Sequence, residues 1–317
     1  MTDPRDLSRR HVLAAAAAIA AVPALAALPN MAAAASSSGR ILHKPIPRGG
    51  EKIPVVGIGT SLVFQWENDP AKMAERTEVV RILMTGGRGM IDTAAGYGTA
   101  EERVGDILSA LKARNKVFLA TKVHVRESTE EREATFKRSQ ERLRTQKFDL
   151  IYAHMLTDPD WDSGQFREWK AKGMARYWGL AHSIDAAYPA IAAVMRRDKP
   201  DFLEVNYSLG DREAEAELLP LAQDISAAVV INLPFGRNAL FKRIGATPLP
   251  DWAKEIDCTS WAQVLLKFVI SHPAVTAVIP GTDKPEYMRD NLAAGRGRQP
   301  DAEMRRRMIA FFDALPG

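Results

Sequence analysis

Side chains that can carry chemistry follow four consecutive apolar runs of the sequence. In chain order they are Asp92 with Tyr97, Lys122 with His124, His154, and His182. Phenol, ammonium and imidazole groups can transfer or orient protons, whereas imidazole and carboxylate groups can also bind zinc. One such residue alone is typical of a solvated surface, but their recurrence after successive runs indicates one site. The residue types leave proton transfer and metal-assisted hydrolysis both open.

The elements that must position these side chains follow a regular alternation after residue 50. Eight apolar runs are interpreted as strands: 55–58, 90–93, 117–121, 150–153, 175–180, 202–206, 228–233 and 275–279. Seven amphipathic stretches are interpreted as helices: 71–85, 100–113, 129–144, 166–172, 184–197, 213–223 and 261–271. Each helix can return the chain for the next parallel strand. The pattern predicts a single-domain α/β fold, a (β/α)8 TIM barrel.

A doubly wound open sheet is the other architecture with this alternation. It usually carries a GxGxxG fingerprint after its first strand, and the segment 57–60 lacks that spacing. In a barrel, active sites form at the C-terminal ends of the strands. The polar residues that follow strands two to five are therefore expected to meet at one rim.

Five ordered segments resemble those of the aldo-keto reductase family: 56–60, 92–101, 120–122, 149–154 and 279–282. The resemblance implies that the family's Asp, Tyr, Lys and His tetrad falls on Asp92, Tyr97, Lys122 and His154. Tyr97 would then give a proton to the carbonyl oxygen as hydride reaches the carbon. Lys122 would lower the pKa of Tyr97, Asp92 would hold Lys122 charged, and His154 would orient the substrate oxygen.

The same resemblance implies a nicotinamide dinucleotide cofactor, NADP(H), with NAD left open because Tyr287 stands where many members have Arg. The cofactor residues that it implies are Gly59, Thr60, His182, Glu204, Phe235, Arg237, Thr282, Lys284, Asp290 and Asn291. Thr282 and Lys284 would hold a 2′-phosphate. Several of these positions depart from the family pattern, since His182 and Glu204 stand where many members have Asn and Gln. Asn232 replaces a tyrosine that stacks on the nicotinamide, and Phe235 is the nearest aromatic residue.

Residues 1–38 resemble a twin-arginine export signal followed by a flexible start. Arg9 and Arg10 precede an alanine-rich run, 14–28, and small residues at 32–35 suit a signal peptidase. Because alanine is a weak membrane former and Pro23 interrupts the run, a cleaved signal is favoured over an uncleaved anchor. The expected partner is the twin-arginine translocase, and the expected location is the periplasm or the exterior. Residues 39–317 would form the barrel.

The composition of the chain excludes some kinds of structural site and argues against some kinds of partner. The single cysteine, Cys258, excludes an internal disulfide and a cysteine-based zinc cluster. A net charge of +4 without a long Lys/Arg block argues against a nucleic-acid partner, and we expect a monomer. The leading hypothesis is an NADP(H)-dependent oxidoreductase acting on a small carbonyl substrate, without a metal. The alternatives are a metal-dependent barrel hydrolase using Asp92 with the histidines, and a non-catalytic nucleotide-binding barrel.

Two loops are expected to contribute substrate contacts: 155–165 with Trp161 and 248–252 with Trp252. Both segments can also be read as aromatic residues that pack on the outside of the barrel.

Overall fold

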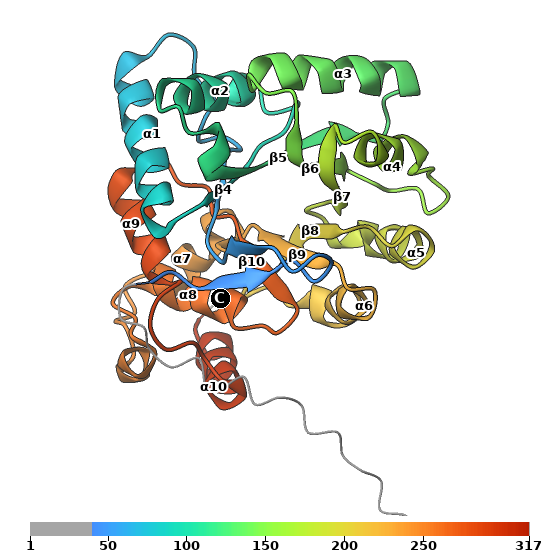
Figure 1. The fold of residues 1–317 in the computed structure, drawn as a ribbon. Helices are drawn as coiled ribbons and strands as arrows, with labels where there is room; N and C mark the ends of the chain where they lie inside the picture. The colour runs from blue at the N-terminus through green and yellow to red at the C-terminus, as the bar shows by residue number, and fades with distance from the viewer. Residues whose placement is uncertain (1–39, 317) are drawn as a thin grey trace, which may run out of the picture. The chain divides into compact units, whose positions relative to one another are not determined.

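The computed structural model describes residues 40–316, and they form a parallel barrel (Figure 1). Its strands are β3 (Ile58–Gly59), β4 (Gly89–Asp92), β5 (Val117–His124), β6 (Phe148–His154), β7 (Ala175–Ala181), β8 (Phe202–Asn206), β9 (Ala228–Asn232) and β10 (Val275–Val278). They pair in sequence order from β3 to β10, all parallel. The eight-stranded barrel expected from the sequence is confirmed.

The barrel closes where the chain before and within β3 meets the end of β10. Parallel bridges join Val56 to Val278 and Gly59 to Gly281. A Cβ atom on Gly59 would lie 2.8 Å from the carbonyl oxygen of Ile279, so only glycine permits this approach. Gly59 therefore has a structural reason to be glycine besides any contact with a cofactor.

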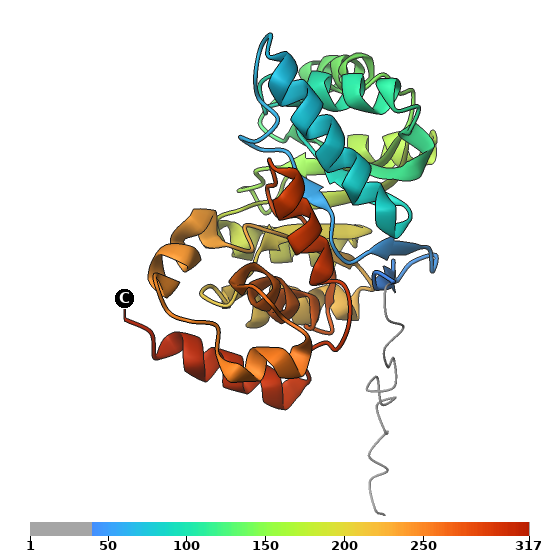
Figure 2. The same ribbon diagram turned by 90° about the vertical axis from the view of Figure 1, so that its left-hand side faces the viewer.

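The seven expected helices are present with shifted ends: α1 (Pro70–Leu83), α2 (Ala100–Ala110), α3 (Thr129–Arg142), α4 (Gly164–Ala171), α5 (Tyr188–Asp198), α6 (Leu218–Asp224) and α8 (Trp261–Ile270). Three further α-helices lie outside these seven stretches: α7 (Ala239–Ile244), α9 (Pro285–Ala293) and α10 (Ala302–Asp313). Short 3₁₀ turns complete the set: η2 (Met84–Gly86), η3 (Arg114–Lys116), η4 (Asp185–Ala187), η5 (Glu213–Glu215), η6 (Gly236–Asn238) and η7 (Asp251–Ile256). Helix α9 packs beside α1, as both views show (Figures 1 and 2).

A hairpin that the sequence reading missed precedes the barrel. Strands β1 (His43–Pro45) and β2 (Lys52–Pro54) pair antiparallel. Ile46 and Ile53 of this hairpin are fully buried in one cluster with Phe118 and Phe202 from the barrel interior. The hairpin therefore closes the N-terminal end of the barrel with apolar side chains and leaves the C-terminal end for polar groups.

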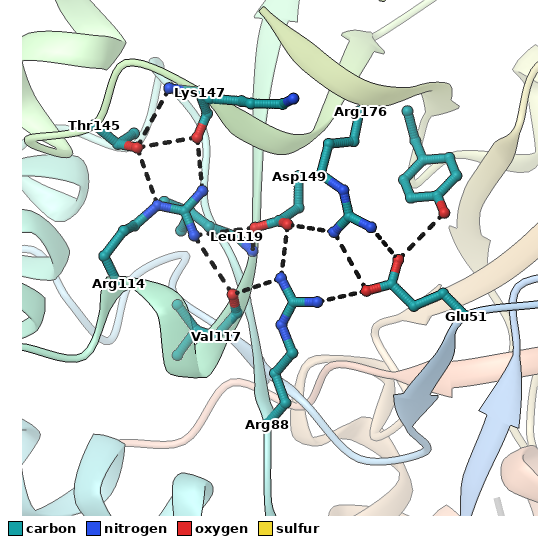
Figure 3. A network of polar contacts seen from close by, with 10 residues as sticks. Glu51, Arg88, Arg114, Val117, Leu119, Thr145, Lys147, Asp149 and Arg176 are labelled. Atoms are coloured by element: carbon teal, nitrogen blue, oxygen red, sulfur yellow. Dashed lines mark hydrogen bonds and ion pairs between the residues drawn. The ribbon is translucent and has the colours of Figure 1, made fainter. Parts of the chain in front are cut away.

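A network of charges lies where the hairpin meets the N-terminal ends of the strands (Figure 3). Asp149, at the start of β6, accepts hydrogen bonds from Arg88 (2.7 Å), Arg176 (2.7 Å) and Arg114 (3.0 Å). Glu51 of the hairpin pairs with Arg88 and Arg176 from the other side. The Asp149 side chain is only 4% exposed, so this carboxylate joins three strands and the hairpin.

Replacing Asp149 with Asn is expected to destabilise the protein by about 3 kcal/mol at pH 7, because three guanidiniums would lose their common carboxylate. Burial alone would raise the pKa of Asp149, but the Leu119 N–H and the three arginines lower it below its ordinary value. A carboxyl whose pKa falls on folding stabilises above its unfolded pKa and loses this contribution as pH falls through its folded pKa. Urea unfolding should therefore show a difference in the free energy of unfolding between the native protein and Asp149→Asn, and this difference should shrink below about pH 4.

The matched control is Asp224→Asn, because Asp224 is exposed and has no ion pair among the described residues. This variant should unfold within about 0.5 kcal/mol of the native chain. An equal loss in both variants would contradict the role given to the Asp149 network.

Candidate active site

The side chains of the tetrad come from the C-terminal ends of strands and the loops that follow them. Because strand residues alternate between the two faces of the barrel wall, those on the strands point to its inside. On β5, Phe118 and Ala120 belong to the interior cluster, so Lys122 faces inward one step nearer the rim. Thr121 faces outward and donates a hydrogen bond to Glu101 of α2 at 2.7 Å. Asp92 ends β4 and His154 ends β6. Tyr97 lies in the loop between β4 and α2.

Lys122 is the centre of the site's charge. Its ammonium forms ion pairs with Asp92 and with Glu204, the latter at 3.1 Å, and donates to the Thr93 carbonyl at 3.2 Å. Burial alone would lower the pKa of Lys122, but Asp92 and Glu204 raise it well above its usual value. Burial and the neighbouring Glu204 also raise the pKa of Asp92, although Lys122 opposes them. Two buried carboxyl groups therefore share one ammonium.

Tyr97 lies against this ion cluster. The Lys122 ammonium is 5.6 Å from the centre of its ring, and the His154 ring stands edge-on to it at 6.2 Å between centroids. Lys122 lowers the pKa of Tyr97, as expected, but burial together with Glu204 and Asp92 outweighs it and raises the pKa to about 12. The expected net lowering is therefore wrong, because burial of the phenol, and after it the carboxylates of Glu204 and Asp92, oppose Lys122. At neutral pH Tyr97 carries the proton that a carbonyl oxygen needs.

The histidines at the rim are neutral. Burial, followed by Lys122, lowers the pKa of His154 to about 3, and burial also lowers the pKa values of His124 and His182. The Nδ1 atoms of His124 and His182 accept backbone N–H groups at 3.1 Å, so a proton on either neutral ring lies at Nε2. Each of these two rings thus presents an N–H donor.

Next to the tetrad, where β7 and β9 end, the rim contains polar atoms without hydrogen-bond partners in the described part of the chain. His182 is 3% exposed, and its buried Nε2 has no hydrogen-bond partner within residues 40–316. The amide nitrogen of Asn232 donates to the His182 carbonyl at 3.0 Å and to Glu204 at 3.1 Å, which leaves its oxygen unpartnered. An N–H donor beside a free carbonyl acceptor matches a primary carboxamide such as that of nicotinamide. These residues therefore fit the ring end of the cofactor, and the sequence reading had not assigned Asn232 a role.

The loop after β9 carries an unusual backbone. Gly236, Arg237 and Asn238 all have positive φ angles (55°, 50° and 71°), and left-handed conformations of non-glycine residues cost about 1 kcal/mol each. Arg237 is exposed, and its charge also acts on the pKa of Tyr97. Phe235 packs on Phe241 at 5.0 Å between ring centroids. Backbone strain held beside a reactive side chain is typical of a ligand-binding loop.

The segment expected at the adenosine end of the cofactor is partly buried. Asn291 donates to the Thr282 hydroxyl at 3.0 Å, and both side chains are at most 4% exposed. Asp290 accepts from Ser260 at 2.7 Å and from Gln263 at 2.6 Å, which joins α9 to α8. Lys284 alone of this group is exposed, and it precedes Pro285 at the start of α9.

Thr60 is the remaining residue of the cofactor set. It is fully buried beside β4, where its backbone N–H donates to the Asp92 carbonyl at 3.0 Å. Its hydroxyl oxygen has no partner in the described part of the chain.

A cavity of about 570 Å³ opens above the tetrad. Its lining joins three tetrad residues, Tyr97, Lys122 and His154, to the β5–α3 loop and α3. The full lining is Ala95, Gly96, Tyr97, Lys122, His124, Arg126, Glu127, Glu131, Thr135, Arg138, Arg142 and His154. Neither loop expected to bind substrate contributes to it. Trp161 packs on Phe166 at 5.5 Å, and Trp252 packs on Phe311 at 5.8 Å, so both tryptophans stabilise the outer layer.

The alternative metal site is not assembled. Asp92 is engaged by Lys122, and residues 40–316 contain no group of three His, Cys, Asp or Glu side chains placed to hold a metal ion. The hydrolase alternative therefore lacks its ligand set.

A barrel whose rim joins an Asp–Lys ion pair to a tyrosine and a histidine has the site expected of an aldo-keto reductase. The model of the aldo/keto reductase family matches residues 55–308, and the chain belongs to this family. Methylglyoxal reductase YeaE of Escherichia coli (strain K12) is 30% identical over 257 residues, which cover 77% of this chain and 86% of that protein. NADH-specific methylglyoxal reductase of the same organism is 25% identical over 311 residues, with 79% and 93% covered.

The fold also matches solved structures. An aldo/keto reductase from Klebsiella pneumoniae in complex with NADP and acetate superposes with a TM-score of 0.68 at 25% identity, covering 83% of this chain and 93% of that one. The family predicted from the five sequence segments is confirmed. The export signal lies outside the described residues, and no helix within residues 40–316 is long and apolar enough to cross a membrane.

Replacing Glu204 with Gln is expected to lower the pKa of Tyr97, because it removes one of the carboxylates that raise it. Carbonyl reduction needs the protonated phenol, so its rate falls as pH rises through this pKa, whereas alcohol oxidation needs the phenolate. The variant should lose reductase activity at a lower pH and oxidise alcohols several-fold faster at pH 8. Pre-steady-state oxidation rates between pH 6 and 11, which rise with the phenolate fraction below this pKa, measure the shift. The exposed Glu303→Gln serves as control, and coincident profiles for native and E204Q proteins would contradict the assignment.

Proposed function

We propose that this member of the aldo/keto reductase family uses NADPH to reduce aldehydes or ketones, and catalyses the reverse oxidation of alcohols at high pH. The arrangement of Tyr97 between the Lys122 ion cluster and neutral His154 carries the proposal. Bound NADPH supplies the hydride. The part that falls to this chain is to hold a carbonyl group near Tyr97 and to protonate its oxygen.

Each residue then has a distinct task. Tyr97 donates its hydroxyl proton to the developing alkoxide, and Lys122 stabilises the phenolate that remains. Asp92 and Glu204 hold Lys122 in place and keep it charged. Neutral His154 can donate a hydrogen bond to the carbonyl oxygen without competing as an acid, because its pKa lies far below neutral pH.

The cofactor is held by groups on the other side of the rim. The His182 N–H and the Asn232 oxygen suit the carboxamide, and the loop at Gly236–Asn238 suits the pyrophosphate. Exposed Lys284 supports NADPH over NADH because it can meet a 2′-phosphate. Fluorescence titration with each cofactor, followed by turnover of methylglyoxal and glyceraldehyde, tests the proposal. Failure of both cofactors to bind at micromolar concentrations would overturn it.

We also propose that residues 1–38 direct the folded protein through the twin-arginine translocase to the periplasm. The paired Arg9 and Arg10, the weakly apolar alanine run and the small residues at 32–35 support this proposal. Fractionation of cells that express the full chain should place a shortened protein in the periplasm. The Arg9→Lys/Arg10→Lys variant should stay uncleaved inside the cell, and equal export of both would refute the assignment.

A further inference from the structure

The cavity above the tetrad is lined by more cations than the proposed chemistry requires. Besides Lys122, which is already paired, Arg126, Arg138 and Arg142 line it, against two acidic residues. At about 570 Å³ the cavity has the size of a small-molecule site. Its charge therefore bears on which carbonyl compounds enter.

The two acidic residues of the lining accept hydrogen bonds from α3 and from its N-cap residue. Glu127 accepts a hydrogen bond from the Thr135 hydroxyl at 2.7 Å. Glu131 accepts the backbone N–H of Ser128 at 2.8 Å as part of the capping box that begins α3. Neither carboxylate forms an ion pair with a lining arginine in the described part of the chain.

The three arginines differ in how far they are engaged. Arg138 donates to the Thr135 hydroxyl at 2.7 Å, and Arg142 lies 3.7 Å from Glu101. The guanidinium of Arg126 has neither a hydrogen bond nor an ion pair within residues 40–316, although the residue lies only two positions beyond the end of β5. Arg126 is thus the cation of this cavity that remains available to a ligand.

The surroundings of Arg126 place it at the mouth of the active site. His124 and His154 are paired across β5 and β6. His154 is in turn paired with Ala181, the last residue of β7, and His182 follows directly after it. The charge of Arg126 acts on both His124 and His182, the two histidines that flank His154. Arg126, Tyr97 and His154 line the same cavity, so a substrate held there by His154 and Tyr97 shares the cavity with this guanidinium.

From this arrangement, and resting on the proposed reductase function, we infer that the enzyme prefers aldehydes or ketones that also carry an anionic group, a carboxylate or a phosphate monoester. Arg126 binds that group through charge-assisted hydrogen bonds while Tyr97 and His154 hold the carbonyl oxygen. Arg138 and Arg142 add to the positive potential along α3 and attract the anion to the cavity.

Matched substrates test the inference. Succinic semialdehyde is compared with its methyl ester, and glyceraldehyde 3-phosphate with glyceraldehyde, so that the two arms separate carboxylate from phosphate. We expect kcat/KM to be higher for at least one anion than for its neutral partner, and added salt should reduce that preference. Arg126→Ala should lower kcat/KM for the preferred anion by about 10- to 100-fold and leave the neutral partner within about twofold.

Two controls keep the outcomes distinct. Arg306→Ala removes an exposed arginine from α10, outside the cavity, and should change neither substrate. Succinate, which has no aldehyde to reduce, should inhibit the native enzyme competitively and the Arg126→Ala variant at least tenfold less well. Equal losses for anionic and neutral substrates in Arg126→Ala, or no anion preference in the native enzyme, would overturn the inference. Turnover of the neutral aldehydes would still uphold the proposed function in that case. Absence of NADPH-dependent turnover of every aldehyde would instead refute the proposed function.

Discussion

Tyr97→Phe is expected to lower kcat for carbonyl reduction by about 10²- to 10⁴-fold, because the variant loses the group that protonates the substrate oxygen. The protein should fold as before, since the Tyr97 hydroxyl has no hydrogen bond to residues 40–316 and its removal leaves no polar atom newly unpaired. Affinity for NADPH should also be retained. Single-turnover rates with an aldehyde, together with thermal unfolding and cofactor titration, separate these effects.

Tyr152→Phe is the matched control for this experiment. The Lys122 ammonium lies 5.4 Å from the ring centre of Tyr152, close to its 5.6 Å from Tyr97. Tyr152 is fully buried in the interior cluster, and its hydroxyl also lacks a partner in the described structure. Because it does not line the cavity, its variant should keep turnover within about threefold of the native rate. Comparable losses in the two variants would show that Tyr97 is not the proton donor.

The sequence predicted the barrel well because each of its signals is local. An apolar run followed by an amphipathic stretch specifies one strand and one crossover helix, and eight such runs with seven such stretches leave few architectures. The hairpin before the barrel escaped because its two strands are three residues each and are stabilised by distant contacts of Ile46 and Ile53. Helix α7, with six residues, likewise has too short a pattern to recognise.

The identities of the tetrad were predictable, but its electrostatics were not. Pairing between Lys122 and Glu204 depends on two strands brought together by the barrel, and no spacing in the sequence reports it. Lys267 illustrates the same limit. It lies in an apolar helical stretch and is fully buried, yet its ammonium donates to three backbone carbonyls, those of Ile256, Arg296 and Arg298. Only the fold distinguishes a lysine that caps carbonyl groups from one that supports catalysis.

The substrate cavity shows why specificity was harder to predict than chemistry. Aromatic residues in the loops 155–165 and 248–252 suggested a binding surface, but tertiary packing uses them in the outer layer. Outside the tetrad and its loops, the lining comes instead from one face of α3, where Glu131, Thr135, Arg138 and Arg142 recur at intervals of three or four residues. On its own, such a charged helical face is typical of exposure to solvent.

Lys122→Met is expected to have the largest effect on both stability and activity. Met has a similar length without the charge, so the variant leaves Asp92 and Glu204, each 2% exposed, without their ammonium. Breaking a buried ion pair in this way costs about 3–5 kcal/mol. Turnover should also fall steeply, because the Tyr97 phenolate loses the nearest positive charge. Urea unfolding and single-turnover kinetics measure the two losses, with the exposed Lys116→Met as control.

The pH dependence of stability and a double variant then test whether the unpaired carboxyl groups cause the loss of stability in Lys122→Met. Lys122 opposes the effect of burial on Asp92, so without it the pKa of this carboxyl rises further above its unfolded value. The variant should therefore be most like the native protein at low pH and lose stability relative to it as pH rises toward that higher pKa. Adding Glu204→Gln to Lys122→Met removes one stranded carboxylate and should therefore restore about 1–2 kcal/mol at pH 7. In the native background the same substitution removes a favourable ion pair and should not stabilise. The native protein, the two single variants and the double variant form a thermodynamic cycle. If the two substitutions changed the free energy of unfolding additively, Lys122 and Glu204 would not be coupled, and the shared ammonium would be contradicted.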